Sequence, residues 1–449
     1  MRGLPAYVKD TRKIGLFGLG LSNIGVAEFL SARGAYEFIL RSDGEIKEEN
    51  LPTSFKGYPR YSGKHALSSL TEELIFLSPS VNRRREDIKA LAASGVRLSS
   101  DAELFFELVD SPVFAVSGSD GKSTTTRLAS LLLGGLGAVE CGNCGRAMSL
   151  ALDSGASAYA VELSSFMLDS LVPHSKRAVI TSISENHLDF HGTPDAYFAA
   201  KENLYRGTDE PIIWAGRDFS ESFIKKYPPF ALLSTSLGYK ELKMRGGELI
   251  LTLEDDAILK NGERLIEISR LKRREKHNIE NLMSAAALAD GFYERERLFS
   301  VAESFEGIAH RAELVCVKDG VEYIDSSVDS SPTRTATTLR GLAKRVILIL
   351  GGRGKGLSYA PLVSCVGEYA RAVILSGENA PEIKAALLSD DTLEKKGIPL
   401  YERESLADAI RLAKEISTPS DTVLLSPAST SYDKFKNFEE RAEYFKSLI

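Results

Sequence analysis

Short runs of β-branched and apolar residues alternate with helical patterns along the whole chain, and this alternation restarts three times. The first segment opens at KIGLFGLGLSNIG, the second at VFAVSGSDGKSTTT and the third at VEYIDSS. Alternation of this kind is typical of α/β proteins with parallel sheets. A chain of 449 residues also exceeds what one hydrophobic core usually holds. We therefore expect an α/β protein of three domains, with boundaries near residues 105 and 311.

Composition and charge limit the classes of partner. The net charge is −6, which gives no reason to expect nucleic acid or an anionic membrane as a partner. Small molecules are therefore the expected partners. Four scattered cysteines are too few for a disulfide framework, and the first residues lack the apolar core of a signal peptide. Because no apolar run is long enough to span a bilayer, we expect a cytoplasmic protein that does not insert into membranes.

The second segment contains a short glycine loop between a predicted strand and a predicted helix. The common phosphate loop reads G-x-x-x-x-G-K-[ST], and its backbone N–H groups bind phosphates at a helix N-terminus. Gly121, Lys122 and Ser123 fit this pattern, but the nearest earlier glycine is Gly118, so the loop is two residues shorter. A chance G-K-S in a turn is the alternative, but the strand before it and the threonine-rich helix start favour an ATP-phosphate site. Lys122 would neutralise phosphates, and Ser123 and Thr124 would contact phosphate and a metal.

Carboxylate and imidazole side chains follow the later strands of this segment. Glu162 ends the apolar run AYAVE, at the edge where parallel sheets usually present ligands. A lone Glu there is more often a solvated loop residue, but the phosphate loop upstream favours a Mg²⁺ ligand. His187 lies among carboxylates in SENHLDFHG, which is either a metal site or a polar loop. Lys201 lies on a helix that Thr193 and Pro194 predict, and nothing in the sequence distinguishes it from an exposed lysine.

Glycine-rich turns also follow strands in the other two segments. Gly18 and Gly20 belong to an imperfect dinucleotide pattern in which Asn23 replaces the third glycine. We interpret this turn as a pocket for a nucleotide diphosphate, with NAD as the alternative. In the third segment, GGRGKG either is a flexible turn or directs Lys355 and backbone donors toward a carboxylate.

The order of these motifs resembles the Mur ligases, the enzymes that form the amide bonds of the peptidoglycan stem peptide. The similarity covers nearly the whole chain and rests on GSDGKST, GNCG, ENHLDFHG, YFAAKENLY, HNIENLMSAAALA, HRAE, YIDSS and GGRGKG. ELSSFML and LSPASTSYDKFKNFEERA favour the members that add D-glutamate to UDP-N-acetylmuramoyl-L-alanine (UDP-MurNAc-L-Ala). The resemblance implies a monomer with a Rossmann-like UDP-sugar domain (1–104), a central P-loop-type ATPase domain (105–310) and a Rossmann-like acceptor domain (311–449).

The resemblance also implies a two-stage, ATP-dependent reaction. The alanine carboxylate attacks the γ-phosphate of ATP to give an acyl phosphate, and the amine of a D-amino acid then displaces phosphate. Two Mg²⁺ ions and basic side chains would offset the negative charge of both stages. His187 would be first a metal ligand and second a proton acceptor near the amine. Lys201 would be carbamylated by CO₂, because a carbamate can bind Mg²⁺ whereas an ammonium cannot.

The family pattern assigns four sets of residues by position. The catalytic residues would be Lys122, His187, Lys201 and Arg311. The ATP-binding residues would be Gly118, Ser119, Asp120, Gly121, Lys122, Ser123, Thr124, Asn278, Asn281, Arg311 and Asp325. The metal ligands would be Ser123, Glu162, His187 and Lys201. The UDP-sugar would contact Ser22, Arg41, Ser42, Ser80, Asn143 and Ser164, and the acceptor would contact Ser327, Asp329, Lys355, Ser431, Tyr432 and Phe438.

Several positions depart from the family pattern. Asp120 replaces a usual Asn in the loop, and Arg41 replaces an acid that usually faces the uracil. In YIDSSVDSSPT, Ser327 and Asp329 replace a Lys and a Thr, within an alignment that can shift by one residue. This exchange predicts a relaxed acceptor pocket that admits a basic D-amino acid, whose ammonium would pair with Asp329. Two other functions stay open: a sister Mur or folylpolyglutamate-synthetase-like ligase, and a non-catalytic nucleotide-binding protein.

Overall fold

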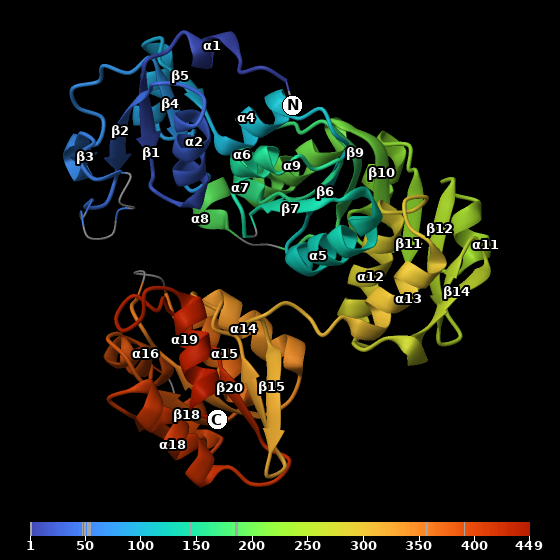
Figure 1. Cartoon of the computed structure of the whole chain (residues 1–449). Coiled ribbons are helices and arrows are strands. Elements are labelled where there is room, and N and C mark those ends of the chain that lie inside the picture. The colour runs from blue at the N-terminus through green and yellow to red at the C-terminus, as the bar shows by residue number, and fades with distance from the viewer. Residues whose placement is uncertain are drawn as a thin grey trace. The chain divides into compact units, whose positions relative to one another are not determined.

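The computed structural model describes residues 2–46, 48, 51, 55–143, 145–184, 187–354, 358–389 and 391–449. The chain divides into two compact units, Met1–Phe305 and Glu306–Ile449 (Figure 1). The described part of the first unit contains two sheets and that of the second contains one, which confirms the α/β class. The division of the first unit at residues 104 and 105 stays a prediction. Within the described ranges, no helix combines the length and apolarity that crossing a bilayer requires.

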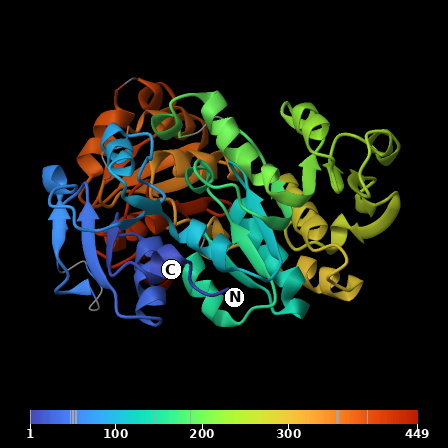
Figure 2. The same ribbon diagram turned by 90° about the horizontal axis from the view of Figure 1, so that it is seen from above.

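The N-terminal sheet has the strand order β3-β2-β1-β4-β5 and is parallel throughout. It belongs to the blue part of the ribbon in Figure 2. Its central strands are buried along almost their whole length, as expected for a parallel sheet covered on both faces. The strands are β1 (Lys13–Phe17), β2 (Glu37–Ser42), β3 (Arg60–Ser62), β4 (Leu74–Leu77) and β5 (Arg97–Ser99). The helices are α1 (Ala6–Lys9), α2 (Leu21–Ser31), α3 (Glu86–Ala93) and α4 (Asp101–Leu108).

The second sheet of the first unit has the order β14-β13-β12-β11-β10-β9-β6-β8-β7. It is parallel from β7 to β12, and β13 and β14 add an antiparallel meander that the predicted alternation does not include. The strands are β6 (Val113–Ser117), β7 (Val139–Gly142), β8 (Tyr159–Glu162), β9 (Ser175–Ile180), β10 (Thr208–Trp214), β11 (Ala231–Ser234), β12 (Leu249–Glu254), β13 (Ala257–Lys260) and β14 (Glu263–Glu267).

Helices cover both faces of this sheet. Ala115 of β6 belongs to the same hydrophobic cluster as Leu204 and Tyr205 of α9, whereas the neighbouring Phe114 meets Phe292, just after α12. Because successive side chains of a strand point to opposite faces, α9 and α12 lie on opposite sides. The helices are α5 (Lys122–Leu132), α6 (Met148–Ala151), α7 (Ser165–Leu168), α8 (Leu188–His191), α9 (Pro194–Arg206), α10 (Ser220–Lys226), α11 (Tyr239–Lys243), α12 (Lys276–Leu288) and α13 (Arg295–Ser304).

The two sheets of the first unit are joined by close helix packing. A Cβ atom on Gly25 of α2 would lie 2.3 Å from the Cβ of Ala147, just before α6, so only glycine allows this approach. The buried carboxylate of Asp101 accepts hydrogen bonds from the backbone N–H groups of Met148 and Ser149, at 2.8 and 2.9 Å. These contacts fix the N-terminal sheet against α6.

The second unit is built on one sheet of order β15-β16-β20-β17-β18-β19, in which only β15 is antiparallel to its neighbour. One hydrophobic cluster joins its sheet to α14, α15 and α16, and another joins it to α18 and α19. The strands are β15 (Glu313–Lys318), β16 (Val321–Asp325), β17 (Val346–Leu350), β18 (Ala370–Leu375), β19 (Leu400–Glu402) and β20 (Thr422–Leu425). The helices are α14 (Pro332–Leu342), α15 (Ala360–Tyr369), α16 (Ala380–Leu387), α17 (Thr392–Lys395), α18 (Leu406–Ile416) and α19 (Phe438–Ser447).

Candidate active site

The glycine loop connects β6 to α5, and both of its glycines are required by their surroundings. Gly118 has φ +149° and Gly121 has φ +80°, which L side chains rarely adopt. A Cβ atom on Gly118 would lie 2.0 Å from Oγ1 of Thr181, and one on Gly121 would lie 2.4 Å from Oδ1 of Asn281. Both positions therefore require glycine, because the loop packs directly against the residue that follows β9 and against α12. Its last residues lead into the N-terminus of α5, where backbone N–H groups favour phosphate.

Lys122 begins α5 and lies over the loop. Its Nζ donates hydrogen bonds to the carbonyl oxygens of Gly118 and Ser119, at 2.8 and 2.9 Å. Ser123 follows in the first turn and is buried, whereas Thr124 is half-buried. Ser119 exchanges a hydrogen bond of 2.8 Å with the hydroxyl of Tyr197 on α9. The loop is thus held from two helices.

Lys201 is fully buried on α9, which begins at Pro194 with Thr193 as its N-cap, as predicted. Its Nζ donates a hydrogen bond of 2.7 Å to the carbonyl oxygen of Gly118 and lies 4.8 Å from the ring centroid of Tyr197. Burial, and after it the charge of Lys122, holds the pKa of Lys201 well below its usual value. A lowered pKa favours the neutral amine of a lysine over the ammonium, and the neutral amine is the form that reacts with CO₂.

Glu162 ends β8 and has one carboxylate oxygen without a hydrogen-bond partner. Its Oε1 accepts a bond of 2.7 Å from Nδ2 of Asn143, while the buried Oε2 has no partner within the described ranges. The side chain is 1% exposed. Because a buried, unpaired carboxylate oxygen is costly, it fits a hard cation such as Mg²⁺. Glu162 also contributes to the electrostatic surroundings of Lys201.

His187 precedes α8 in a left-handed backbone conformation, with φ 54°. Its exposed imidazole packs edge-on against Phe166, with ring centroids 4.8 Å apart. Residues 185 and 186, directly before it, lie outside the described ranges. His187 thus lies at the surface of the first unit.

The serines proposed for the UDP-sugar gather at the carboxyl edge of the N-terminal sheet. Ser22 follows β1 in the first turn of α2, Ser42 ends β2, and Ser80 follows β4. Ser80 is exposed and Ser22 and Ser42 are half-buried. Ser164 lies after β8 of the second sheet and caps α7, because its side chain accepts a hydrogen bond of 3.2 Å from the N–H of Met167.

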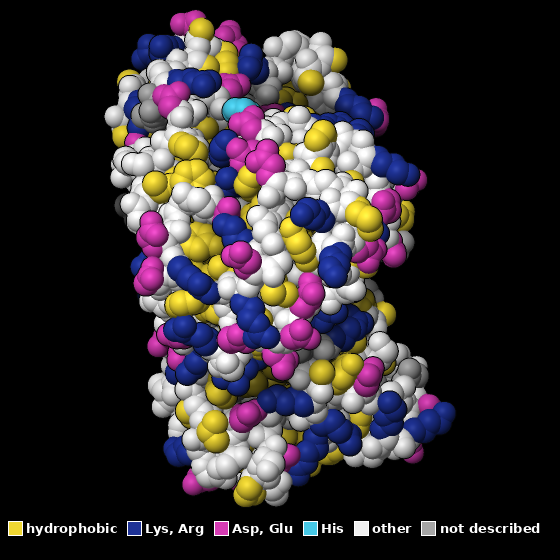
Figure 3. Space-filling model, turned by 90° about the vertical axis from the view of Figure 1, so that its right-hand side faces the viewer, with side chains coloured by type: hydrophobic (Ala, Val, Ile, Leu, Met, Phe, Trp, Pro, Cys, Tyr) yellow, Lys and Arg dark blue, Asp and Glu magenta, His cyan; other side chains and the backbone are white. Residues whose placement is uncertain are grey.

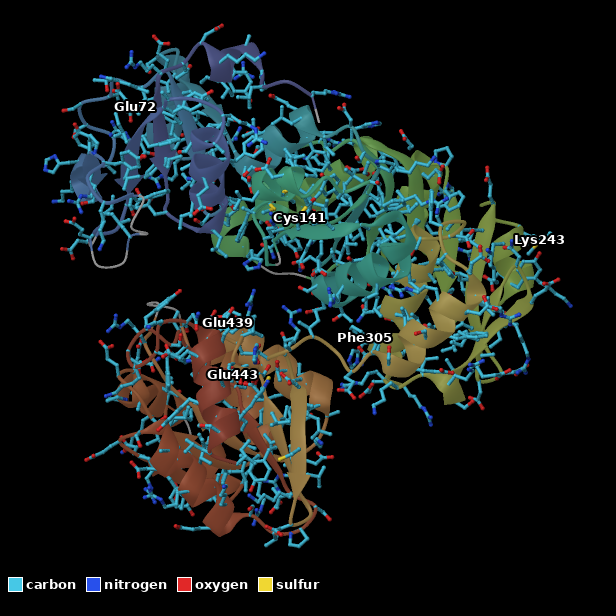
Figure 4. All side chains as sticks on the ribbon, in the orientation of Figure 1. Glu72, Cys141, Lys243, Phe305, Glu439 and Glu443 are labelled. Atoms are coloured by element: carbon cyan, nitrogen blue, oxygen red, sulfur yellow. The ribbon has the colours of Figure 1, made fainter. Side chains whose placement is uncertain are left out.

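Arg41 does not face a ligand, contrary to the prediction from the sequence. Its side chain is 0% exposed, and its Nε and Nη2 donate to the two carboxylate oxygens of Glu72, at 2.6 and 2.9 Å (Figure 4 labels Glu72). Its Nη1 donates to the carbonyl oxygens of Ala66 and Ser68. Four of the five N–H groups of the guanidinium thus have partners, all of them in residues 66–72 before β4. Asp43, the acid next in sequence that an NAD site would use, is paired with Arg85.

The two asparagines of α12 have different surroundings. Asn278 is half-buried, and its Nδ2 donates a bond of 2.9 Å to Glu275. Asn281 is 6% exposed, accepts a bond of 3.2 Å from Thr125, and packs against Gly121. Asn281 therefore supports the phosphate loop. Of the two asparagines, Asn278 is the more exposed and is the better candidate for a contact with adenine.

The ATP candidates of the second unit are Arg311 and Asp325. Arg311 is half-buried in the turn before β15, where its N–H donates to the carbonyl oxygen of Ile308. Asp325 is fully buried, so the predicted ribose contact is not open in this structure. Its carboxylate accepts bonds from the N–H and hydroxyl of Ser327, at 2.9 and 2.6 Å, and lies 2.8 Å from Nδ1 of His310.

The acceptor candidates are mostly buried in the second unit. Ser327 is 0% and Asp329 is 4% exposed, and Asp329 already accepts bonds of 2.7 Å from Thr338 and Ser426. Both bonds reach Oδ2 of the buried carboxylate, and the pairing of Asp329 with a ligand ammonium stays a prediction. Ser431 is buried and Phe438 is half-buried, whereas Tyr432 is 61% exposed. Lys355 lies outside the described residues.

Three residues support the candidates in their own units, and two of them carry no recognisable signal in the sequence. Thr181 forms the wall that excludes a side chain at Gly118, and Tyr197 lies beneath both Ser119 and Lys201. Arg441 of α19 is 3% exposed and donates to the carbonyl oxygens of Ser327 and Ser429. Tyr197 is predictable in part, because it lies four residues before Lys201 on α9 and therefore shares a helix face with it.

Fold and loop together define an α/β protein of the phosphate-binding class, and comparison with known proteins specifies its family. The family model described as the Mur ligase middle domain matches residues 116–289, and the model of the Mur ligase, glutamate ligase domain matches residues 310–429. A UDP-N-acetylmuramoylalanine–D-glutamate ligase of Ruminiclostridium cellulolyticum is 33% identical over 99% of this chain and 98% of its own length. The protein of the same name from Symbiobacterium thermophilum is 32% identical over 99% of both chains. The chain belongs to the Mur ligase family.

Solved structures show the same fold at low sequence identity. UDP-N-acetylmuramate-alanine ligase from Thermotoga maritima is 18% identical, with a TM-score of 0.62 over 97% of this chain and 98% of that one. A pseudomurein peptide ligase type C from Methanothermus fervidus is 14% identical, with a TM-score of 0.55 over 98% of this chain and 100% of that one. At these identities the similarity concerns the fold alone.

Proposed function

We propose that this protein is an ATP-dependent ligase that joins D-glutamate to UDP-MurNAc-L-Ala in peptidoglycan precursor synthesis. The printed names of the full-length relatives support this choice of substrates. The structural observation that carries the proposal is the convergence of Lys122 and Lys201 on the carbonyl oxygen of Gly118. A ligase of this family that forms an acyl phosphate requires one lysine that binds phosphate and a second, buried lysine that loses its proton readily. Lys122 and Lys201 would fill these two roles at one loop.

The residues present fit ATP with Mg²⁺. Backbone N–H groups at the start of α5 and the Lys122 ammonium would bind the phosphates. Ser123 and Glu162 would hold one Mg²⁺, to which Glu162 offers its unpaired Oε2. His187 and Lys201 would hold a second. Bound Mg²⁺ would offset the negative charge on the phosphates.

We propose that Lys201 acts as a carbamate. Its neutral amine would form a C–N bond to CO₂ and release one proton, which leaves a carboxylate equivalent on the side chain. The low pKa and the enclosed position of Lys201 support this step. A carbamate oxygen would replace a buried ammonium with a ligand for a cation.

The proposed reaction has two stages. The carboxylate of the alanyl substrate attacks the γ-phosphorus, the bond to the bridging oxygen breaks, and ADP leaves. The amine of D-glutamate then attacks the acyl carbon, phosphate leaves, and the amine loses a proton. Lys122 would stabilise the charge on the transferred phosphoryl group, as would Arg311 after it. His187, which is exposed, would be first a metal ligand and second an acceptor of the amine proton.

Phosphate release from ATP, measured with UDP-MurNAc-L-Ala and a panel of amino acids, tests this function. Turnover with D-glutamate that Lys122→Ala abolishes would support it, with Lys243→Ala on an exposed helix as the matched control. Turnover with another acceptor or another UDP-sugar would indicate a sister ligase. Binding of nucleotide without any turnover would indicate a non-catalytic protein.

A further inference from the structure

One loop of the N-terminal sheet holds the short helix α8. The loop, residues 78–85, connects β4 to α3, whereas α8 follows β9 of the second sheet. Nδ2 of Asn82 donates a hydrogen bond of 2.8 Å to the carbonyl oxygen of Phe190. Nη1 of Arg84 donates one of 3.2 Å to the carbonyl oxygen of His191. The partners lie 108 and 107 positions apart in the chain, so these bonds join the two halves of the first unit.

These bonds stabilise a helix that is too short to be stable alone. α8 has four residues, and isolated helices shorter than about 12 residues are marginal in water. The last carbonyl oxygens of a helix have no partner within it. Phe190 and His191 end α8, and their carbonyl oxygens are the acceptors of Asn82 and Arg84. The position of α8 therefore depends on the loop.

The two donors are themselves held by neighbouring groups. Oδ1 of Asn82 accepts a hydrogen bond of 2.8 Å from the N–H of Arg84, so both ends of the amide are used. The guanidinium of Arg84 also forms an ion pair with Asp169, which follows α7 and has a side chain 8% exposed. The loop thus contacts the end of α7 and the end of α8 together.

His187 is connected to α8 through its backbone and through its ring. Its carbonyl oxygen accepts hydrogen bonds of 3.1 and 3.0 Å from the N–H groups of Phe190 and His191. The ring centroid of Phe166 lies 4.3 Å from that of Phe190 and 4.8 Å from that of the imidazole. A left-handed backbone such as that of His187 costs free energy and persists where surrounding contacts fix it. A shift of α8 would therefore move the imidazole.

The same loop carries a candidate contact of the UDP-sugar. Ser80 lies two residues before Asn82 and is exposed. A ligand at Ser80 and a cation at His187 would therefore meet the two ends of one hydrogen-bonded connection. Two ligands that bias the position of the same element are coupled, and the coupling is reciprocal.

We propose that Asn82 and Arg84 are positioning residues for His187, which connect the second Mg²⁺ with the UDP-sugar. Neither side chain would itself touch the cation. The inference rests on the proposed function, in which His187 and Lys201 hold that Mg²⁺. It adds the residues through which one substrate would affect the cation.

Hydrogen exchange of the full chain without ligands tests the contacts themselves. Asn82→Asp retains the oxygen that faces the N–H of Arg84 but replaces the donor to Phe190 by an oxygen, and Arg84→Gln breaks the second contact. In both variants we expect the amides of Phe190 and His191 to exchange about tenfold faster or more, because α8 opens locally. Unchanged exchange in both variants would overturn the proposal.

Arg85→Gln is the matched control in the same loop. Arg85 forms ion pairs with Asp43 and Asp87, which both belong to the N-terminal sheet and its helices. Exchange in α8 should therefore be the same in Arg85→Gln as in the unchanged protein. Equally fast exchange in Arg85→Gln would show that any change in the loop opens α8, and would contradict a specific role of Asn82 and Arg84.

Binding of Mn²⁺ in the presence of AMP-PNP tests the effect on the cation without turnover. Electron paramagnetic resonance counts free Mn²⁺, and we expect two bound ions in the unchanged protein. In Asn82→Asp and Arg84→Gln the affinity for one ion should fall by about 10–100-fold, and that for the other should not change. Equal losses for both ions would indicate general damage and overturn the proposal, as would unchanged affinities.

A double variant shows whether Asn82 acts through His187. His187→Ala should lose the same ion, and the addition of Asn82→Asp should weaken Mn²⁺ binding no further, because residues that act through one contact are not additive. A further loss in the double variant would contradict the assignment.

UDP-MurNAc-L-Ala tests the connection between the two ligands. It should tighten binding of the weakened ion by about fivefold or more in the unchanged protein and have no such effect in Asn82→Asp. The same gain in both proteins, or none in the unchanged protein, would overturn the connection. Because none of these measurements depends on turnover, a failure of D-glutamate to react would affect the proposed ligation alone.

Discussion

Lys122 and Lys201 donate hydrogen bonds to the same acceptor, the carbonyl oxygen of Gly118, at 2.8 and 2.7 Å. The two lysines come from helices that the sequence separates by almost eighty residues, α5 and α9. Their like charges repel, and the charge of Lys122 is the second cause, after burial, of the lowered pKa of Lys201. The phosphate loop therefore favours the neutral amine at position 201.

If Lys201 becomes a carbamate, its removal should abolish turnover. Lys201→Ala should lower kcat by about 10²–10³-fold, the loss typical of one preorganised electrostatic group. Lys201→Arg should be equally impaired, because a guanidinium forms no such carbamate. Added acetate or formate should restore part of the activity of Lys201→Ala by supplying a carboxylate. Full activity of Lys201→Arg in a steady-state assay would contradict the role.

The same residue predicts a specific dependence of stability on pH. In bicarbonate-free buffer, the unfolded chain binds a proton at Lys201 up to about pH 10.4, whereas the folded chain has released it at lower pH. Stability therefore rises with pH between the folded and unfolded pKa values, by at most about 1.4 kcal/mol per unit. Lys201→Met has no group that must release a proton on folding, so below this pH window it should be more resistant to urea than the unchanged protein. The difference between the two free energies of unfolding should decrease as pH rises through the window.

The matched control for this measurement is Lys243→Met. Lys243 is an exposed lysine of α11 at the surface of the first unit (Figure 4). Its replacement should leave the slope of stability against pH as it is in the unchanged protein. A constant difference between Lys201→Met and the unchanged protein across the pH range would contradict the assignment.

The loop should not tolerate a side chain at Gly118. In Gly118→Ala the new Cβ would lie 2.0 Å from Oγ1 of Thr181, at a backbone φ of +149°. We expect a loss of stability of about 1–3 kcal/mol from the backbone alone and a raised KM for ATP. Gly137→Ala is the control, since Gly137 has φ +63° and open space around it. Equal effects of the two substitutions would show that the wall at Thr181 does not matter.

The distribution of charged side chains on the surface gives little information about partners. The face in Figure 3 carries acidic and basic side chains that are interspersed, without a field of one sign. This distribution is compatible with the small-molecule partners expected from a net charge of −6. It does not by itself identify them.

Local patterns predicted the elements well, and long-range contacts decided what could not be predicted. The alternation of strands and helices, the glycine loop and the start of α9 at Thr193 are local signals, and the structure confirms them. Lys201 looks exposed in the sequence because its burial depends on a loop far away in the chain. Arg41 looks like a ligand contact for the same reason, since its partner Glu72 comes from the loop before β4.

The buried pair of Arg41 and Glu72 should be important for stability. Glu72→Gln would leave the guanidinium without a countercharge inside the sheet, at a cost of about 3–5 kcal/mol. Burial raises the pKa of Glu72, but the hydrogen bonds and charge of Arg41 outweigh this effect, and the net pKa is lowered. Stability should therefore fall as pH falls through that lowered value, and less so in Glu72→Gln. Glu86→Gln, in an exposed pair with Lys89, should change neither quantity measurably in chemical denaturation.

The unpaired oxygen of Glu162 predicts a particular kind of impairment. Glu162→Gln retains an oxygen that accepts the bond from Asn143 but removes the charge that a cation would meet. We expect the Mg²⁺ concentration for half-maximal activity to rise by about 10–100-fold, with activity recovered at high Mg²⁺. Thermal stability without nucleotide should not fall, because the buried charge is costly in the absence of a cation. A lower maximal rate with an unchanged Mg²⁺ dependence would exclude Glu162 as a metal ligand and leave it only the positioning of Asn143.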